Sequence, residues 1–323
     1  MLARDPNALK SMSGDELAKA LDSGVSILSS LKCGVIRKKL FFVALFARLV
    51  AFLTVRRADN NSFEAQRKSL RKLLQKYTPV RFENASERPS NYKYEGGSVI
   101  AFNHPSLGDI PRLILFTMQD TPDRRIRFAI NLAWYEALNP IKGFLDNVGI
   151  DLSPIITPKL KDEILGRHPE FKDELSSIEK KLIMNYGADV VKSLNNHEVV
   201  IVAPTATRKP KLFDYPSQSR GAEKFNIEAL SFIAKYCTNK KRVTSTINDS
   251  AIIPLCIMPP IGFKPGLNLK LEYEFSSIDA FRFHESSFDL RCCTPVGNNI
   301  LESKYMDSLK ICCEQSDRHD MIW

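Results

Sequence analysis

The sequence predicts an α/β fold, with a mixed, largely parallel central sheet flanked by helices and a small N-terminal all-helical domain in front of it. Helical periodicity fills the first eighty residues. Short apolar runs typical of buried strands then alternate with helical segments over about 200 residues. We therefore expect two domains, an N-terminal helical domain at residues 1–80 and an α/β domain at residues 81–323.

The composition is ordinary for a globular protein. Of the 323 residues, 44% are hydrophobic and 26% are charged, and the mean hydropathy of −0.19 argues against a polytopic membrane protein. A net charge of +9 indicates anionic partners. We expect no nucleic acid among them, because the chain has no nucleic-acid-binding motif and no basic stripe interleaved with aromatic residues. The seven cysteines have no zinc spacing and no secretory signal accompanies them, so we expect reduced thiols, a cytoplasmic location and no metal.

Three helices are expected in the N-terminal domain. Ser13 and Glu16 form a capping-box pattern that starts the first helix, and Gly34 ends it. The third is predicted over Phe63–Tyr77, with Asn61 as its cap and a basic outer face.

The second helix, Leu40–Val55, is apolar on every side except for Arg48, and Arg56 and Arg57 follow it. Such a helix needs to be buried. It is short for a membrane span, which takes about 20 apolar residues. We expect it to form the core of a helical bundle, with in-plane peripheral membrane contact and a true membrane span as the alternatives.

The α/β domain is organised around Gly97–Met118. Within it, Ser98–Phe102 is short, apolar and β-branched, which predicts a buried strand, and Arg112–Met118 predicts a helix. The residues between them are typical of a tight turn. His104 is therefore expected at the C-terminal end of a strand and Asp109 near the start of a helix, at the edge of the sheet where ligands usually bind.

The remaining elements continue the alternation of strands and helices. A polar linker is expected at Arg81–Gly97. The other expected elements are strands at Arg124–Ala129, Val148–Leu152, Val199–Ala203, Ala251–Met258 and Leu267–Phe275, and helices at Leu132–Leu145 and Ser177–Leu194. This order is typical of a largely parallel sheet.

The spacing of His104 and Asp109 allows the two side chains to meet across the turn. The carboxylate would then accept the imidazole Nδ1–H and fix the tautomer, leaving Nε2 free as a general base. Backbone N–H groups at the helix start would favour an anionic group or a developing oxyanion. The structural alternative is that Asp109 is only a helix N-cap and His104 an ordinary strand-end histidine.

A second loop of interest, PTATRKPK, follows the apolar strand VVIVA. It contains Arg208, whose guanidinium can hold a phosphate with two hydrogen bonds, and Lys209 and Lys211 add positive charge beside it. Such a basic loop is more often a solvated surface than a site. Its interest lies in its expected place at the end of another strand of the same sheet.

Three blocks of the sequence, NHPSLGD, APTATR and AIIPLCIMPP, together resemble the glycerol-3-phosphate acyltransferase superfamily, whose signature is His-x-x-x-x-Asp. The chain looks most similar to the soluble chloroplast-type branch, which also has an N-terminal helical domain. The resemblance covers roughly Ser98 to Ser276. It implies an enzyme that transfers a fatty acyl group from acyl carrier protein or coenzyme A to the sn-1 hydroxyl of glycerol 3-phosphate. His104 and Asp109 would be catalytic, and neither a cofactor nor a metal would be needed.

The sequence departs from this family in its basic residues. Pro210 stands where the chloroplast branch has a second arginine, which leaves Lys209 or Lys211 beside Arg208 for the phosphate. A further phosphate-binding basic pair does not align uniquely. Its two candidate positions are Lys159 with Lys161 and Arg167 with His168. Acylation of lysophosphatidate or another phosphorylated alcohol, and a non-catalytic module that binds anionic membranes, remain alternative functions.

Overall fold

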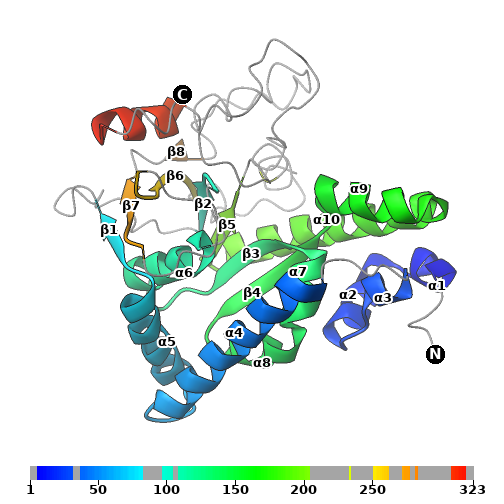
Figure 1. Cartoon of the computed structure of the whole chain (residues 1–323), viewed down its shortest axis with the longest axis horizontal. Helices are drawn as coiled ribbons and strands as arrows, with labels where there is room; N and C mark the ends of the chain where they lie inside the picture. The colour runs from blue at the N-terminus through cyan, green and yellow to red at the C-terminus, as the bar shows by residue number, and fades with distance from the viewer. Residues whose placement is uncertain are drawn as a thin grey trace. The chain divides into compact units, whose positions relative to one another are not determined.

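The computed structural model describes residues 6–31, 37–82, 97–104, 108–203, 233, 250–261, 271–276, 281–282 and 307–317 (Figure 1). Within these residues the predicted fold class is confirmed, since the chain combines a mixed, largely parallel sheet with many helices. The helices are α1 (Pro6–Ser11), α2 (Gly14–Asp22), α3 (Ile27–Ser30), α4 (Arg37–Arg57), α5 (Phe63–Tyr77), α6 (Asp109–Asp120), α7 (Leu132–Leu138), α8 (Lys142–Asn147), α9 (Pro158–Arg167) and α10 (Lys172–Asn195). The strands are β1 (Val80–Phe82), β2 (Ser98–Phe102), β3 (Ile126–Asn131), β4 (Ile150–Ile155), β5 (Val199–Val202), β6 (Ala251–Met258), β7 (Tyr273–Ser276) and β8 (Phe281–Arg282).

The chain divides into two compact units. The first contains residues 1–70 and 127–189, and the second contains residues 71–126 and 190–323. The regular elements described up to Tyr77 are all helices, as predicted. The units nevertheless do not follow the predicted boundary at residue 80, because the N-terminal helices belong to the same unit as residues 127–189.

The first unit has one apolar core that explains this grouping. Leucines and isoleucines of α1, α2 and α3, such as Leu17 and Ile27, pack with buried side chains of α7, α9 and α10, such as Leu132 and Leu182. Both Leu17 and Ile27 are fully buried. Burying a side chain of this size stabilises the fold by about 1.5–3 kcal/mol, so the short N-terminal helices obtain their stability from these neighbours.

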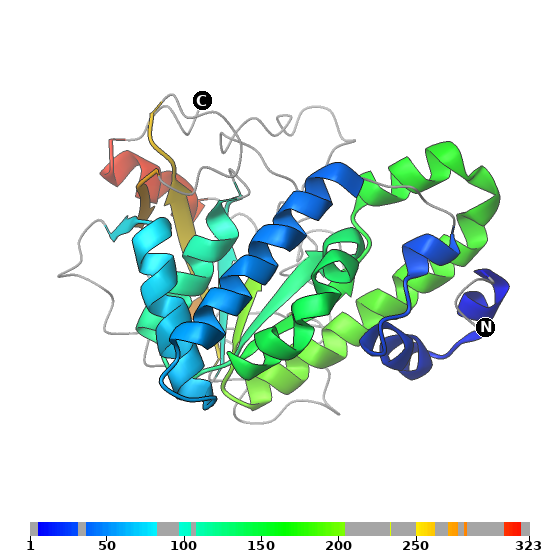
Figure 2. The same cartoon turned by 60° about the horizontal axis from the view of Figure 1, so that its bottom comes forward.

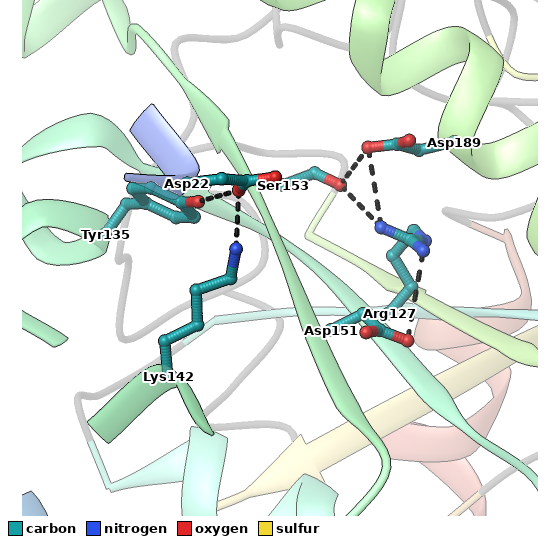
Figure 3. A network of polar contacts seen from close by, with 7 residues as sticks. All are labelled: Asp22, Arg127, Tyr135, Lys142, Asp151, Ser153 and Asp189. Atoms are coloured by element: carbon teal, nitrogen blue, oxygen red, sulfur yellow. Dashed lines mark hydrogen bonds and ion pairs between the residues drawn. The ribbon is translucent and has the colours of Figure 1, made fainter. Parts of the chain in front are cut away.

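Polar contacts also join elements of the first unit (Figure 3). The hydroxyl of Tyr135 on α7 donates to the Asp22 carboxylate at the end of α2, at 3.1 Å. The Asp189 carboxylate on α10 accepts from the Ser153 hydroxyl on β4, at 2.9 Å, and lies 3.4 Å from the Arg127 guanidinium of β3. The first contact joins α2 to α7, and the contacts of Asp189 join α10 to β3 and β4.

The first helix is shorter than the sequence suggested. Its start is confirmed, because the Glu16 amide donates to the Ser13 hydroxyl at 3.3 Å and the Ser13 amide donates to the Glu16 carboxylate at 2.7 Å. The helix does not continue towards Gly34, however. It ends at Asp22, Gly24 just beyond has a φ of 84° that favours glycine, and Ile27–Ser30 forms a separate turn of helix.

Other predicted bounds also need correction. The bounds Phe63–Tyr77 of α5 are confirmed, but the side-chain cap is Ser62, whose hydroxyl accepts from the Ala65 amide, and not Asn61. The predicted helix Leu132–Leu145 is split by a 3-10 turn that contains Pro140, because proline lacks the N–H that a continuous helix needs. Part of the expected linker, Arg81 with Phe82, forms the short edge strand β1.

α4 packs against α7 and the 3-10 turn after it (Figure 2). The expectation that this helix is buried as a bundle core is correct for one side only. Ala51 and Thr54 are buried, but Leu49 and Phe52 are 52% and 59% exposed. Among the helices that the structure describes, none combines the length and the apolar character that crossing a membrane requires.

The sheet of the second unit has the order β1-β7-β6-β2-β5. β2 lies between β5 and β6 and is parallel to both, with Ser98 opposite Val199 on one side and Ala251 on the other. β6 is antiparallel to β7 and to β8. Because parallel strands share a direction, the C-terminal ends of β2, β5 and β6 meet at one edge, and the candidate site begins there.

Candidate active site

The residue after β2 is fastened to the neighbouring strand. Asn103 is 3% exposed, and its side-chain amide makes two hydrogen bonds with the backbone of Ile257 in β6. Its Nδ2 donates to the Ile257 carbonyl at 2.9 Å, and its Oδ1 accepts from the Ile257 amide at 2.6 Å. These two side-chain bonds replace the backbone hydrogen bonds that would link the strands if β2 continued by one residue. It fixes the backbone from which His104 projects.

His104 and Asp109 are in direct contact. The imidazole Nδ1 lies 2.9 Å from Oδ2 of the carboxylate, as the spacing of the two residues predicted. The side chain of His104 is 16% exposed and that of Asp109 is fully buried. The imidazole and the Phe102 ring also lie in an edge-to-face arrangement, with 5.6 Å between the centroids. The ring is therefore held from two sides while part of it remains open to solvent.

This contact determines what the imidazole can do. An ionised carboxylate only accepts hydrogen bonds, so Nδ1 carries the proton in the contact and Nε2 of the neutral ring keeps its lone pair. A histidine oriented in this way can take a proton from a hydroxyl group at Nε2, and the carboxylate then stabilises the imidazolium that forms. The geometry is that of a general base with its orienting acid.

Asp109 is the first residue of α6, and the N-cap position belongs to Gly108, which makes no side-chain capping bond. The carboxylate of Asp109 therefore does more than an N-cap would, since it reaches across to His104. Its place in the first turn is favourable for a negative charge, because the helix dipole is positive at that end.

Arg112, in the first turn of α6, is fully buried. Its guanidinium donates to three backbone carbonyls, those of Gly108 at 2.7 Å, Leu271 at 2.5 Å and Pro79 at 3.4 Å. It also stacks on the Tyr273 ring, 3.8 Å from the centroid. Burial lowers the pKa of Arg112, and the charges of Tyr273 and Asp109 oppose that shift. Arginine nevertheless stays protonated in proteins, so a permanent cation holds the carbonyl of Gly108, the residue directly before Asp109.

We expect Arg112→Lys to lower the free energy of unfolding by about 2–4 kcal/mol, because a lysine ammonium cannot serve three carbonyls in the fork geometry or stack on the ring. Urea unfolding measures the loss. Arg81→Lys is the matched control, since Arg81 is 64% exposed and pairs with Glu274 on the surface. An exposed pair of this kind contributes less than about 1 kcal/mol. Equal losses in the two variants would contradict a structural role for Arg112.

The basic residues of the PTATRKPK loop, Arg208, Lys209 and Lys211, lie outside the described residues. The strand that leads into this loop is described. β5 ends at Val202, which is opposite Ala101 of β2 in a parallel register. The described end of β5 therefore lies at the same edge of the sheet as His104.

The other candidate phosphate ligands, Lys161, Arg167 and His168, belong to the first unit. Each is close to a different carboxylate. Lys161 pairs with Glu179, Arg167 lies 3.4 Å from Glu163, and His168 lies 3.1 Å from Glu170. The structure thus gives each of them an acidic partner in its own unit, and their role in phosphate binding stays a prediction.

Sequence reasoning missed the supporting roles of Asn103 and Arg112. Asn103 was interpreted as an ordinary turn residue, and its partner Ile257 is 154 positions away in the chain. Arg112 interrupts a run of apolar residues directly after Pro111, which is the only signal of its burial that the sequence contains. Among the residues that the structure describes, no three His, Cys, Asp or Glu side chains gather in a way that could hold a metal ion. The expectation that no metal or cofactor is needed stays a prediction.

A comparison with protein-family models found no match, and no curated protein matches the chain either. The functional assignment therefore depends on the geometry of this site and on its residues.

Proposed function

We propose that the chain is an acyltransferase that moves a fatty acyl group from an acyl thioester of acyl carrier protein or coenzyme A to the sn-1 hydroxyl of glycerol 3-phosphate, giving lysophosphatidate. The observation that supports this most is the 2.9 Å contact between His104 Nδ1 and the fully buried Asp109 carboxylate. It leaves an oriented, partly accessible imidazole at the C-terminal edge of a parallel sheet.

In the proposed reaction, Nε2 of His104 takes the proton of the sn-1 hydroxyl as its oxygen attacks the thioester carbonyl. The carbon–oxygen bond forms while the carbonyl oxygen becomes an oxyanion. Collapse of this intermediate breaks the carbon–sulfur bond, and the imidazolium returns its proton to the departing thiolate. Asp109 stabilises the imidazolium throughout, and no acyl-enzyme is formed.

The basic residues supply the second half of the proposal. Acceptor and donors are all anionic, which agrees with the net charge of +9. Arg208 belongs to the loop that follows β5, and β5 ends beside β2. A phosphate held from that loop would decide which hydroxyl reaches His104, and such positioning can contribute about 7–11 kcal/mol to barrier lowering in the best cases.

Arg208→Lys separates phosphate recognition from the chemical step. Lysine keeps the charge but loses the two-pronged geometry, so we expect the KM for glycerol 3-phosphate to rise about tenfold or more while kcat changes little. Glycerol, which has no phosphate, serves as the control acceptor. Arg208→Ala should hardly alter the slow reaction with glycerol. Equal impairment with both acceptors would show that Arg208 acts elsewhere.

The proposal is tested by incubating the purified protein with radiolabelled glycerol 3-phosphate and either acyl-carrier-protein or coenzyme A thioesters. Lysophosphatidate is supplied as a competing acceptor in parallel reactions. Labelled lysophosphatidate is the expected product. Preferential conversion of added lysophosphatidate to phosphatidate would instead assign the alternative acceptor.

A further inference from the structure

Helix α4 buries its small residues and exposes its large apolar ones, which is the opposite of what a helix of a globular protein usually does. Its small residues face the protein, with Ala51 at 7% and Thr54 at 0% exposure, and Ala47 is half-buried on the same side. The Thr54 carbonyl is capped from α5, because the Ser69 hydroxyl donates to it at 2.9 Å. The helix therefore contacts the rest of the first unit through the side that carries its small residues.

The large apolar residues of α4 point away from this contact. Leu45, Leu49 and Phe52 are 52%, 52% and 59% exposed, and their spacing of four and three residues places them on one helical face. Phe46 and Val55 are also exposed beside them. A helix that contacts only its own protein and water normally buries such residues and exposes its small or polar ones. We name Leu45, Phe46, Leu49, Phe52 and Val55 the α4 outer face.

The charges of α4 are all of one sign. Arg48 lies among the residues of the outer face, Arg56 and Arg57 are at the end of the helix, and all three are exposed. The sequence of α4, from residue 37 to residue 57, contains no Asp or Glu. Arginine stems can lie along apolar surface while their guanidinium groups reach outward, so the face combines an apolar centre with cations that can meet anionic headgroups.

We propose that the α4 outer face lies in the plane of an anionic lipid bilayer, with its leucines and phenylalanines among the acyl chains and its arginines at the headgroups. This orientation fits a helix with six Lys or Arg residues and no acidic ones. A second copy of the chain is a poorer occupant. In a two-fold interface the same patch meets itself, which would bring the arginines of both copies together without a carboxylate from either helix. The inference does not depend on the acyl-transfer reaction.

Vesicle co-sedimentation of the full chain tests this inference. Vesicles are made of phosphatidylcholine with about 30% phosphatidylglycerol, or of phosphatidylcholine alone. We expect the protein to bind the anionic vesicles, and the Leu49→Glu/Phe52→Glu variant to bind them more than about tenfold more weakly, because two large apolar side chains are lost from the contact. Met184→Glu is the matched control. Met184 is 53% exposed on α10, a helix that contains carboxylates, so this variant should bind as the wild type does.

Further measurements separate lipid binding from misfolding and from dimerisation. Arg48→Gln/Arg56→Gln leaves the apolar residues in place, and it should weaken binding to anionic vesicles several-fold while leaving any binding to neutral vesicles unchanged. Circular dichroism and light scattering establish the fold and the oligomeric state. The proposal is overturned if the wild type does not bind anionic vesicles, if Leu49→Glu/Phe52→Glu binds them normally, or if the protein is a dimer that this variant converts to monomers.

Discussion

Replacing His104 with alanine should abolish acyl transfer while leaving the fold and glycerol 3-phosphate binding almost unchanged. The imidazole acts on the hydroxyl proton, so its removal takes away general-base catalysis, which contributes about 10²–10⁴-fold to the rate. The side chain is 16% exposed, and we expect water to take its place beside Asp109 in the variant. Steady-state kinetics measures kcat, and isothermal titration measures binding of glycerol 3-phosphate.

His197→Asn is the matched control for this variant. His197 is exposed and has a φ of 58°, a conformation that asparagine also tolerates. It precedes β5, so it lies at the opposite edge of the parallel strands from His104. Its replacement should leave kcat as it is. Near-normal turnover by His104→Ala would remove the proposed mechanism, whatever the binding data show.

Asp109→Asn should reduce kcat by about 10²–10⁴-fold with little effect on KM. The amide has the shape of the carboxylate, so the fold should persist. Its NH₂ group can donate to Nδ1, however, and that contact would move the ring proton to Nε2, where the base is needed. The imidazolium would also lose its compensating charge. A pure loss of stability with normal kcat would show instead that Asp109 only supports the turn.

Asp307→Asn provides the comparison for this second prediction. Asp307 is exposed at the start of the helical residues 307–315, so the same chemical change there removes one surface charge and no catalytic contact. We expect its activity and its unfolding midpoint to match those of the wild type. A similar loss in both variants would indicate a general effect of charge and not the His104 contact.

Local signals in the sequence predicted the parts of this site that are close together in the chain. The strand at Ser98–Phe102 and the helix that begins at Asp109 are determined by residues within about twenty positions of one another. The bounds of β2 and β6 agree with the prediction residue for residue. The pairing of His104 with Asp109 followed from the same local geometry.

The contacts that complete the site come from far along the chain, and no local pattern contains them. Asn103 binds Ile257, and Arg112 binds the carbonyl of Leu271, because β6 and β7 happen to lie beside β2 and α6 in the folded sheet. The order of strands decides these neighbours, and periodicity does not reveal strand order. The exposed side of α4 could not be predicted for the same reason, since it also depends on which elements lie beside the helix in the fold. An all-apolar helix does not show which of its sides will be covered, and the structure covers the side with alanine and threonine.

A single-turnover experiment tests directly whether His104 catalyses acyl transfer to glycerol 3-phosphate. Wild-type protein in excess over a radiolabelled acyl thioester is mixed with glycerol 3-phosphate, quenched at increasing times, and the product is analysed for the position of the acyl group. We expect the wild type and His197→Asn to form 1-acyl lysophosphatidate at the same rate. His104→Ala should form it at least about 10²-fold more slowly. Formation of the same product at equal rates by wild type and His104→Ala, or no product from either thioester with a folded wild-type protein, would contradict this expectation.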